Sequence, residues 1–70
     1  MKIPLRKIVG DKIKFLRKEL DFTQEAFADR CGFARSYMSR IERGKANLSL
    51  DAIEIIAIAL NVSESELLER

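Results

Sequence analysis

Between residues 35 and 43, the sequence places arginine and serine side chains on one side of a short predicted helix. Met38 and Ile41 give this helix one apolar edge, and its outward side carries Arg35, Ser36, Ser39 and Arg40. A guanidinium can donate two parallel hydrogen bonds to O6 and N7 of guanine, and a serine hydroxyl can pair with several base edges or phosphates. The pattern therefore indicates a helix suited to the major groove of DNA.

Tyr37 lies among these residues and leaves two interpretations open. Its ring could contact a thymine methyl group or the neighbouring DNA backbone. It could equally be partly buried against the first helix of the chain.

The rest of the sequence offers little for catalysis. It contains no histidine, no glycine-rich phosphate loop and no pair of carboxylates in an apolar setting. The single cysteine, Cys31, has no neighbouring base and falls on the inward side of its predicted helix, so we expect it to pack in the core. We predict a protein that is not an enzyme and that has no metal, no cofactor and no small-molecule substrate.

A second predicted helix positions the first. Thr23 is suited to cap a helix that begins at Gln24, and Gly32 can end that helix because glycine accepts a left-handed backbone conformation. The next helix then runs over residues 35–43 and ends at Gly44, with Ala34 offering no capping side chain at its start. The stretch reads as helix, tight turn, helix.

Apolar periodicity predicts three more helices, over residues 8–20, 50–60 and 64–69, after a poorly ordered lead-in of residues 1–7. Ser49 and Ser63 are the expected caps of the last two. The expected core stripe of the first is Val9, Ile13, Leu16 and Leu20, and that of residues 50–60 is Leu50, Ile53, Ile56, Ala57 and Leu60. Five short helices with short connections predict an all-α, compact single domain over residues 1–70.

A second apolar stripe on the helix over residues 50–60 needs a different partner. A domain of 70 residues is small enough that an oligomer interface would add useful stability. We therefore predict a two-fold homodimer interface on this helix and the last one. Its expected residues are Ala52, Ile55, Ala59 and Val62, with Leu67 or Leu68.

Charge is unevenly distributed along the chain. Residues 1–45 hold 12 basic and 6 acidic residues, a balance of +6, whereas residues 46–70 hold 1 and 5, a balance of −4. The front part is suited to attract a polyanion. No apolar run approaches the roughly 20 residues that span a bilayer, and the start lacks the apolar segment of a signal peptide. We expect a cytoplasmic protein that does not bind membranes.

The stretch TQEAFADRCGFARSYMSRIERGK resembles the helix-turn-helix of the phage repressor and Cro superfamily. Gln24 opens the first helix, Ala28 matches the position where the helices cross closely, Gly32 lies in the turn, and Ile41 and Glu42 lie near the end. The resemblance covers about residues 8–62. It implies a five-helix fold with DNA as the ligand.

Within that superfamily, the chain is most similar to the restriction-modification controller proteins, because Arg35, Ser36 and Tyr37 match the R-[S/T]-Y opening of their recognition helix. The resemblance implies that Arg35 and Ser36 face bases, with Tyr37 and Ser39 nearby. It further implies that phosphates are approached by Thr23, Gln24, Arg43 and Lys45. It also implies a structural pair between Arg17 and Glu42.

The leading hypothesis is a homodimeric transcriptional regulator that binds a near-palindromic double-stranded operator. The resemblance implies control of its own promoter and of an endonuclease gene, with RNA polymerase as a further candidate partner. A phage-type repressor and an antitoxin-like autorepressor share this chemistry and remain alternatives. The acidic end and the exposed isoleucines motivate one alternative of another class, a helix-turn-helix used only as a protein-interaction module.

Overall fold

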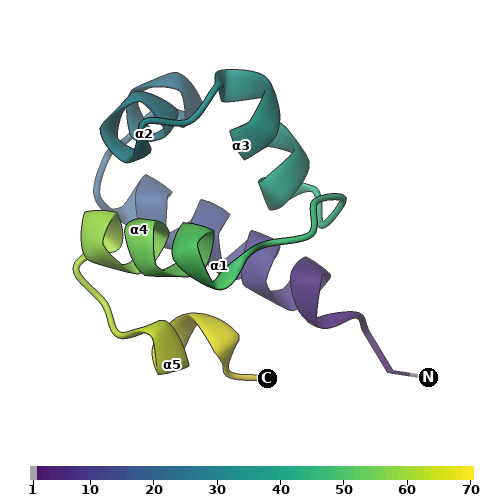
Figure 1. Cartoon of the computed structure of the whole chain (residues 1–70). Coiled ribbons are helices and arrows are strands. Elements are labelled where there is room, and N and C mark those ends of the chain that lie inside the picture. The colour runs from purple at the N-terminus through teal and green to yellow at the C-terminus, as the bar shows by residue number, and fades with distance from the viewer. Residues whose placement is uncertain (1) are drawn as a thin grey trace.

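The computed structural model describes residues 2–70, which fold into five α-helices without any strand (Figure 1). The helices are α1 (Leu5–Glu19), α2 (Gln24–Cys31), α3 (Arg35–Glu42), α4 (Leu50–Leu60) and α5 (Glu64–Leu68). The predicted all-α, five-helix fold is therefore confirmed. No helix in the described range has both the length and the apolar character needed to cross a membrane.

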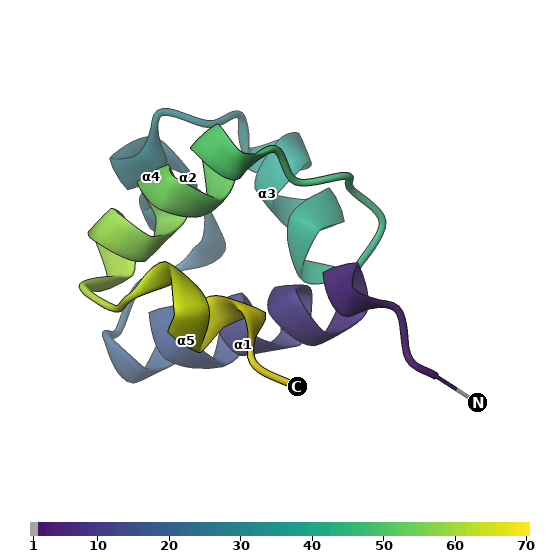
Figure 2. The ribbon, with the colours of Figure 1, turned by 60° about the horizontal axis from the view of Figure 1, so that its bottom comes forward.

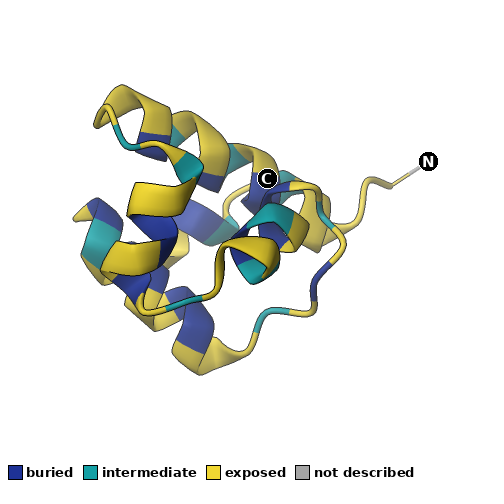
Figure 3. Ribbon diagram, turned by 90° about the horizontal axis from the view of Figure 1, so that it is seen from above, coloured by how far each residue is buried: buried dark blue, intermediate teal, exposed yellow. Residues whose placement is uncertain are grey.

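The helices pack around one apolar core. Helix α1 contacts α3, α4 and α5, while α2 contacts α3 and α4 and lies behind α4 in Figure 2. Buried residues face inward on the helices and exposed residues face outward (Figure 3). The largest fully buried side chains come from every helix: Val9, Ile13, Phe27, Met38, Ile41, Ile56 and Leu67.

Three helix starts carry the caps that the sequence predicted. The Oγ1 atom of Thr23 and the Oγ atoms of Ser49 and Ser63 accept hydrogen bonds from backbone amides three residues ahead, at 3.1, 3.0 and 3.2 Å. Gly32 ends α2 in the left-handed region with a φ of 76°. Because these signals are local, the start of each of the last four helices lies where the sequence placed it.

Helix α1 differs from its prediction at both ends. It begins at Leu5, directly after Pro4, so that residues 5–7 are helical and not part of a lead-in. Proline suits the start of a helix because its ring fixes φ and it has no N–H group to leave unpaired. Leu20 follows the last helical residue and is 50% exposed, so it does not extend the core stripe.

The core face of α4 is also shifted from its prediction. Leu50 is 82% exposed, whereas Ala52 is only 5% exposed. At about 100° per residue, Leu50 falls at the margin of the arc that carries Ile53, Ile56 and Leu60. Ala52 lies about 40° beyond Ile56 at the opposite margin of this arc. It is buried and therefore extends the core face on that side.

Candidate nucleic-acid interface

Helix α3 lies at the edge of the fold, with no other helix of the described chain over its outer side (Figure 1). Met38 and Ile41 anchor it, because they are 0% and 1% exposed. Arg35, Ser36 and Arg40 are exposed on the outer side, and Ser39 is half-buried. The helix therefore presents the polar surface that its sequence predicted.

Tyr37 is fixed by an aromatic contact. Its ring meets the ring of Phe33 edge to face, with centroids 5.1 Å apart and planes at 71°. Tyr37 is half-buried and packs against the core as well as against Phe33, which agrees with the interpretation that expected partial burial. The contact restricts the ring beside the exposed residues of α3.

The amino end of α3 carries no capping side chain. Ala34 occupies the cap position and makes no side-chain hydrogen bond, as the sequence predicted. The first turn of α3, residues 35–38, contains no acidic residue. An approaching phosphate or base edge therefore meets no carboxylate in that turn.

Arg17 and Glu42 form the buried pair that the resemblance implied. Arg17 Nε donates to Glu42 Oε2 at 2.6 Å, and Nη2 donates to Oε1 at 2.9 Å. Arg17 Nη1 also donates to the carbonyl oxygen of Phe22 at 3.0 Å, and Gln24 Nε2 donates to Glu42 Oε1 at 3.1 Å. The network ties α1 and the start of α2 to the carboxyl end of α3.

Some of the predicted phosphate-binding residues lie together at the carboxyl end of α3. The bond from Gln24 to Glu42 places its side chain there, and Arg43 and Lys45 follow directly in the chain. Arg43 Nε donates to the carbonyl oxygen of Ser39 at 3.3 Å, and Thr23 keeps a free hydroxyl hydrogen although its oxygen caps α2. Arg35 begins α3 at the opposite end, about 12 Å away by helical rise.

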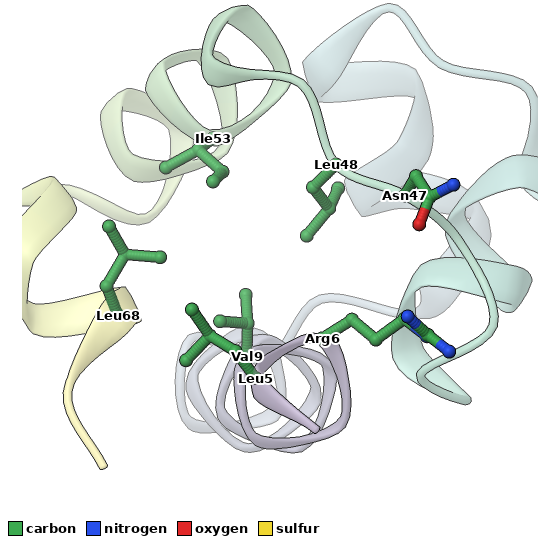
Figure 4. Close-up of a pocket in the computed structure, with 7 residues that line it drawn as sticks. All are labelled: Leu5, Arg6, Val9, Asn47, Leu48, Ile53 and Leu68. Carbon is green, nitrogen blue, oxygen red and sulfur yellow. The ribbon is translucent and has the colours of Figure 1, made fainter.

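Two residues predicted to face a second copy lie inside this chain. Leu67 is fully buried and Ala52 is 5% exposed, so their assignment to a dimer interface is wrong. Leu68 is half-buried and points into a mostly apolar hollow of about 200 Å³ between α1, α4 and α5 (Figure 4). The sequence could not show this, because the position of α5 on α1 depends on contacts far apart in the chain.

The apolar surface that remains on α4 is narrower than predicted. Ile55 is 40% exposed and Ile58 is 73% exposed, and both line a shallow hollow of about 220 Å³ with Arg30 and Ala59. Val62 is half-buried. Ile58 was missed, although its spacing of three residues from Ile55 places the two on neighbouring positions of one helical face.

Cys31 belongs to the core. Burial raises the pKa of its thiol to about 11, an effect that nearby Arg30 only partly offsets. The thiol is therefore protonated at neutral pH and is a poor nucleophile.

Comparison with known proteins places this geometry in a family. The sequence model of a family described as helix-turn-helix matches residues 13–67, so the chain belongs to that family. The control protein C.MunI from a Mycoplasma species is 48% identical over 83% of this chain and 80% of its own length. The family consists of transcriptional regulators, which confirms that the chain is not an enzyme.

Two solved structures share the fold. The restriction-modification controller protein C.AhdI from Aeromonas hydrophila is 35% identical, with a TM-score of 0.84 over 89% of this chain and 94% of that one. SinR of Bacillus subtilis, solved in complex with DNA, is 37% identical, with a TM-score of 0.82 over 87% of this chain and 98% of that one. The chain is thus a helix-turn-helix, DNA-binding transcriptional regulator.

The relatives include other kinds of regulator. An immunity repressor of Bacillus phage phi105 is 42% identical, and the antitoxin PezA of Streptococcus pneumoniae is 43% identical. The chain spans only 40% and 35% of their respective lengths.

Proposed function

We propose that this chain is a restriction-modification controller that binds a near-palindromic operator as a homodimer and regulates its own gene and an endonuclease gene. The main support for DNA reading by α3 is the exposure of its outer side. Arg35, Ser36 and Arg40 are exposed there, whereas Met38 and Ile41 on the inner side are buried. The identity to C.MunI favours the controller subtype.

In this proposal the two ends of α3 have different tasks. Arg35 and Ser36 contact base edges in the major groove, with Tyr37, Ser39 and Arg40 beside them. Thr23, Gln24, Arg43 and Lys45 contact phosphates and fix the register of the helix on the duplex. The network around Glu42 ties Gln24 to the last residue of α3 and ties α3 to α1, so it sets the position of Gln24 relative to the recognition surface.

Arg35 provides the test of base reading. Replacing it with alanine is expected to weaken operator binding by about 1 to 3 kcal/mol and to relax selectivity at one base pair of each half-site, because a guanine loses both of its hydrogen-bond donors. Competition band shifts with operator variants measure both effects.

The matched control is Lys45→Ala. It should weaken binding to all sequences alike and reduce the slope of log K against log salt concentration by about 1. If Arg35→Ala behaved in the same way, Arg35 would be a phosphate contact and α3 would not read bases as proposed.

The homodimer is proposed to form through the exposed part of α4. Ile55 and Ile58 provide the apolar centre, and Ala59 and Val62 flank it. A two-fold dimer of this kind presents two copies of α3 to half-sites about 34 Å apart, one helical turn of DNA.

Replacing Ile58 with aspartate is expected to give monomers. Each copy loses apolar surface at the interface and the two charges meet across the two-fold axis, so the dimer dissociation constant rises at least about tenfold. Sedimentation velocity measures the change. Phe15→Asp is the matched control, because Phe15 is 62% exposed on α1. A dimer that survived Ile58→Asp, or one that Phe15→Asp also disrupted, would contradict this interface.

The subtype has a separate test in the position of the operator. A controller's operator, selected from random DNA, should recur upstream of its own gene and of an adjacent endonuclease gene. An operator found only beside prophage genes or a toxin gene would contradict the controller assignment and leave DNA reading by α3 intact.

A further inference from the structure

A basic hollow lies where the first turn of α1 meets the loop after α3. It has a volume of about 540 Å³ and is lined by Arg6 and Lys7 of α1 and by Arg43, Gly44, Lys45 and Asn47 of the loop. Arg6, Lys7, Arg43 and Lys45 are all exposed, so four cations share one concave surface. No carboxylate of the described chain lines it.

The two sides of the hollow are held together by a close contact of backbone. Gly44 has a φ of 72°, and a Cβ atom built there would lie 2.9 Å from the Cα atom of Lys7. The loop therefore rests directly on the first turn of α1, and Figure 2 shows the two segments side by side. Arg6 extends from α1 toward the end of α3 (Figure 4).

The hollow adjoins the end of α3 at which Gln24 is held. Gln24 bonds to Glu42, the last residue of α3, and Arg43 is the next residue in the chain. A DNA backbone that passes Gln24 and Arg43 therefore reaches the hollow next. Arg6 and Lys7 lie far from Arg43 in the sequence, and only the fold makes them neighbours.

We propose that Arg6 and Lys7, with Arg43 and Lys45, bind a backbone phosphate of the operator, so that the DNA interface extends beyond the helix-turn-helix onto α1. The inference rests on the proposed function. A phosphate suits the site because its anionic oxygens can accept hydrogen bonds from several ammonium and guanidinium groups at once.

One nearby group competes with the phosphate. Lys7 Nζ lies 2.7 Å from Asp11 Oδ1, and both side chains are about half exposed. An exposed pair of this kind is weak and exchanges readily for a better partner. Asp11 therefore opposes DNA binding. The proposal can be tested a second time by removing this charge, which should raise the affinity for DNA.

The experiment measures binding of operator and of scrambled DNA across a salt series for the unaltered chain and for the double variant Arg6→Gln and Lys7→Gln. The slope of log K against log salt concentration should fall by about 0.9 for each phosphate that the variant no longer neutralises. When the salt concentration rises fourfold, the affinity of the double variant should therefore fall by a factor that is roughly 3.5-fold smaller, per phosphate, than the factor for the unaltered chain. The effect should be equal on both DNAs, because phosphate contacts carry no sequence information.

Lys18→Gln is the matched control on the same helix. Lys18 is exposed about 18 Å from Arg6 by helical rise, beyond the Debye length of about 10 Å at 0.1 M salt. A slope unchanged in the double variant, or changed only as much as in Lys18→Gln, would overturn the proposal. If the unaltered chain bound no DNA, the proposed function itself would fail.

Asp11→Asn should shift binding the other way. It frees Lys7 and removes a negative charge beside the hollow, so affinity for both DNAs should rise at low salt. Glu19→Gln is its control, with the same change in charge at the far end of α1. Equal effects of the two variants would show a general charge effect and contradict a phosphate in this hollow.

Discussion

Replacing Glu42 with alanine is expected to lower the free energy of unfolding by about 3 to 5 kcal/mol, because it leaves the buried Arg17 guanidinium without a counter-charge. Arg17 is only 6% exposed and donates two hydrogen bonds to Glu42. Gln24 loses its partner as well. A small domain has a total stability of roughly 5 to 15 kcal/mol, so the variant should be partly unfolded near its working temperature. Urea denaturation followed by circular dichroism measures the loss.

A double variant, Arg17→Met and Glu42→Leu, separates the cost of an unpaired charge from the worth of the pair. Apolar replacement of a buried ion pair is often neutral or stabilising, so the double variant should be more stable than Glu42→Ala. Glu54→Ala provides the surface control, because Glu54 is exposed on α4. If Glu42→Ala cost no more than Glu54→Ala, the network would not hold α1 to α3 as described.

Replacing Gly10 with alanine is expected to cost about 3 kcal/mol or more, at or above the upper end for overpacking a core. A Cβ atom at Gly10 would lie 2.3 Å from the carbonyl oxygen of Ile41 and 3.2 Å from that of Glu42. Both atoms belong to backbone, so α1 and α3 must move apart to accept it. The denaturation midpoint should fall steeply.

Gly32→Ala is the matched control for this variant. Gly32 has a φ of 76° but no atom within 4 Å of the added carbon, so its cost is the left-handed strain of roughly 1 to 2 kcal/mol. A Gly10 variant that was less affected than the Gly32 variant would contradict the close crossing of α1 and α3. Loss of DNA binding should accompany the Gly10 variant, since α3 is the helix displaced.

The sequence predicts the ends of helices well where the signal is local. Thr23, Ser49 and Ser63 cap the helices that they were expected to cap, and Gly32 ends α2 as expected. Each signal acts within three or four residues, so it does not depend on how the helices are packed.

Contacts between segments that are distant in the chain were harder to predict from the sequence. The resemblance placed the close helix crossing at Ala28, and the role of Gly10 was missed because its neighbours, Ile41 and Glu42, come from another helix. Leu67 was assigned to a partner surface because its spacing cannot show whether α5 packs on α1 or faces outward.

In the candidate site, too, local features could be predicted from the sequence and contacts between distant segments could not. The exposed polar side of α3 follows from the spacing of Met38 and Ile41, which the sequence shows directly. The basic hollow at Arg6 and Lys7 does not, because it exists only where the loop after α3 rests on α1. The pair of Arg17 and Glu42 came from the resemblance, since neither residue stands out by its spacing.

The most direct test of the central claim, that α3 reads bases, is selection of bound DNA from a random pool by the unaltered chain and by Arg35→Ala in parallel. The unaltered chain should enrich an inverted repeat with half-sites one helical turn apart and bind it at least roughly a thousandfold more tightly than scrambled DNA. Arg35→Ala should lose one base preference at the same position in both half-sites. Failure of the unaltered chain to enrich any sequence, or an identical base preference in both proteins, would contradict the account.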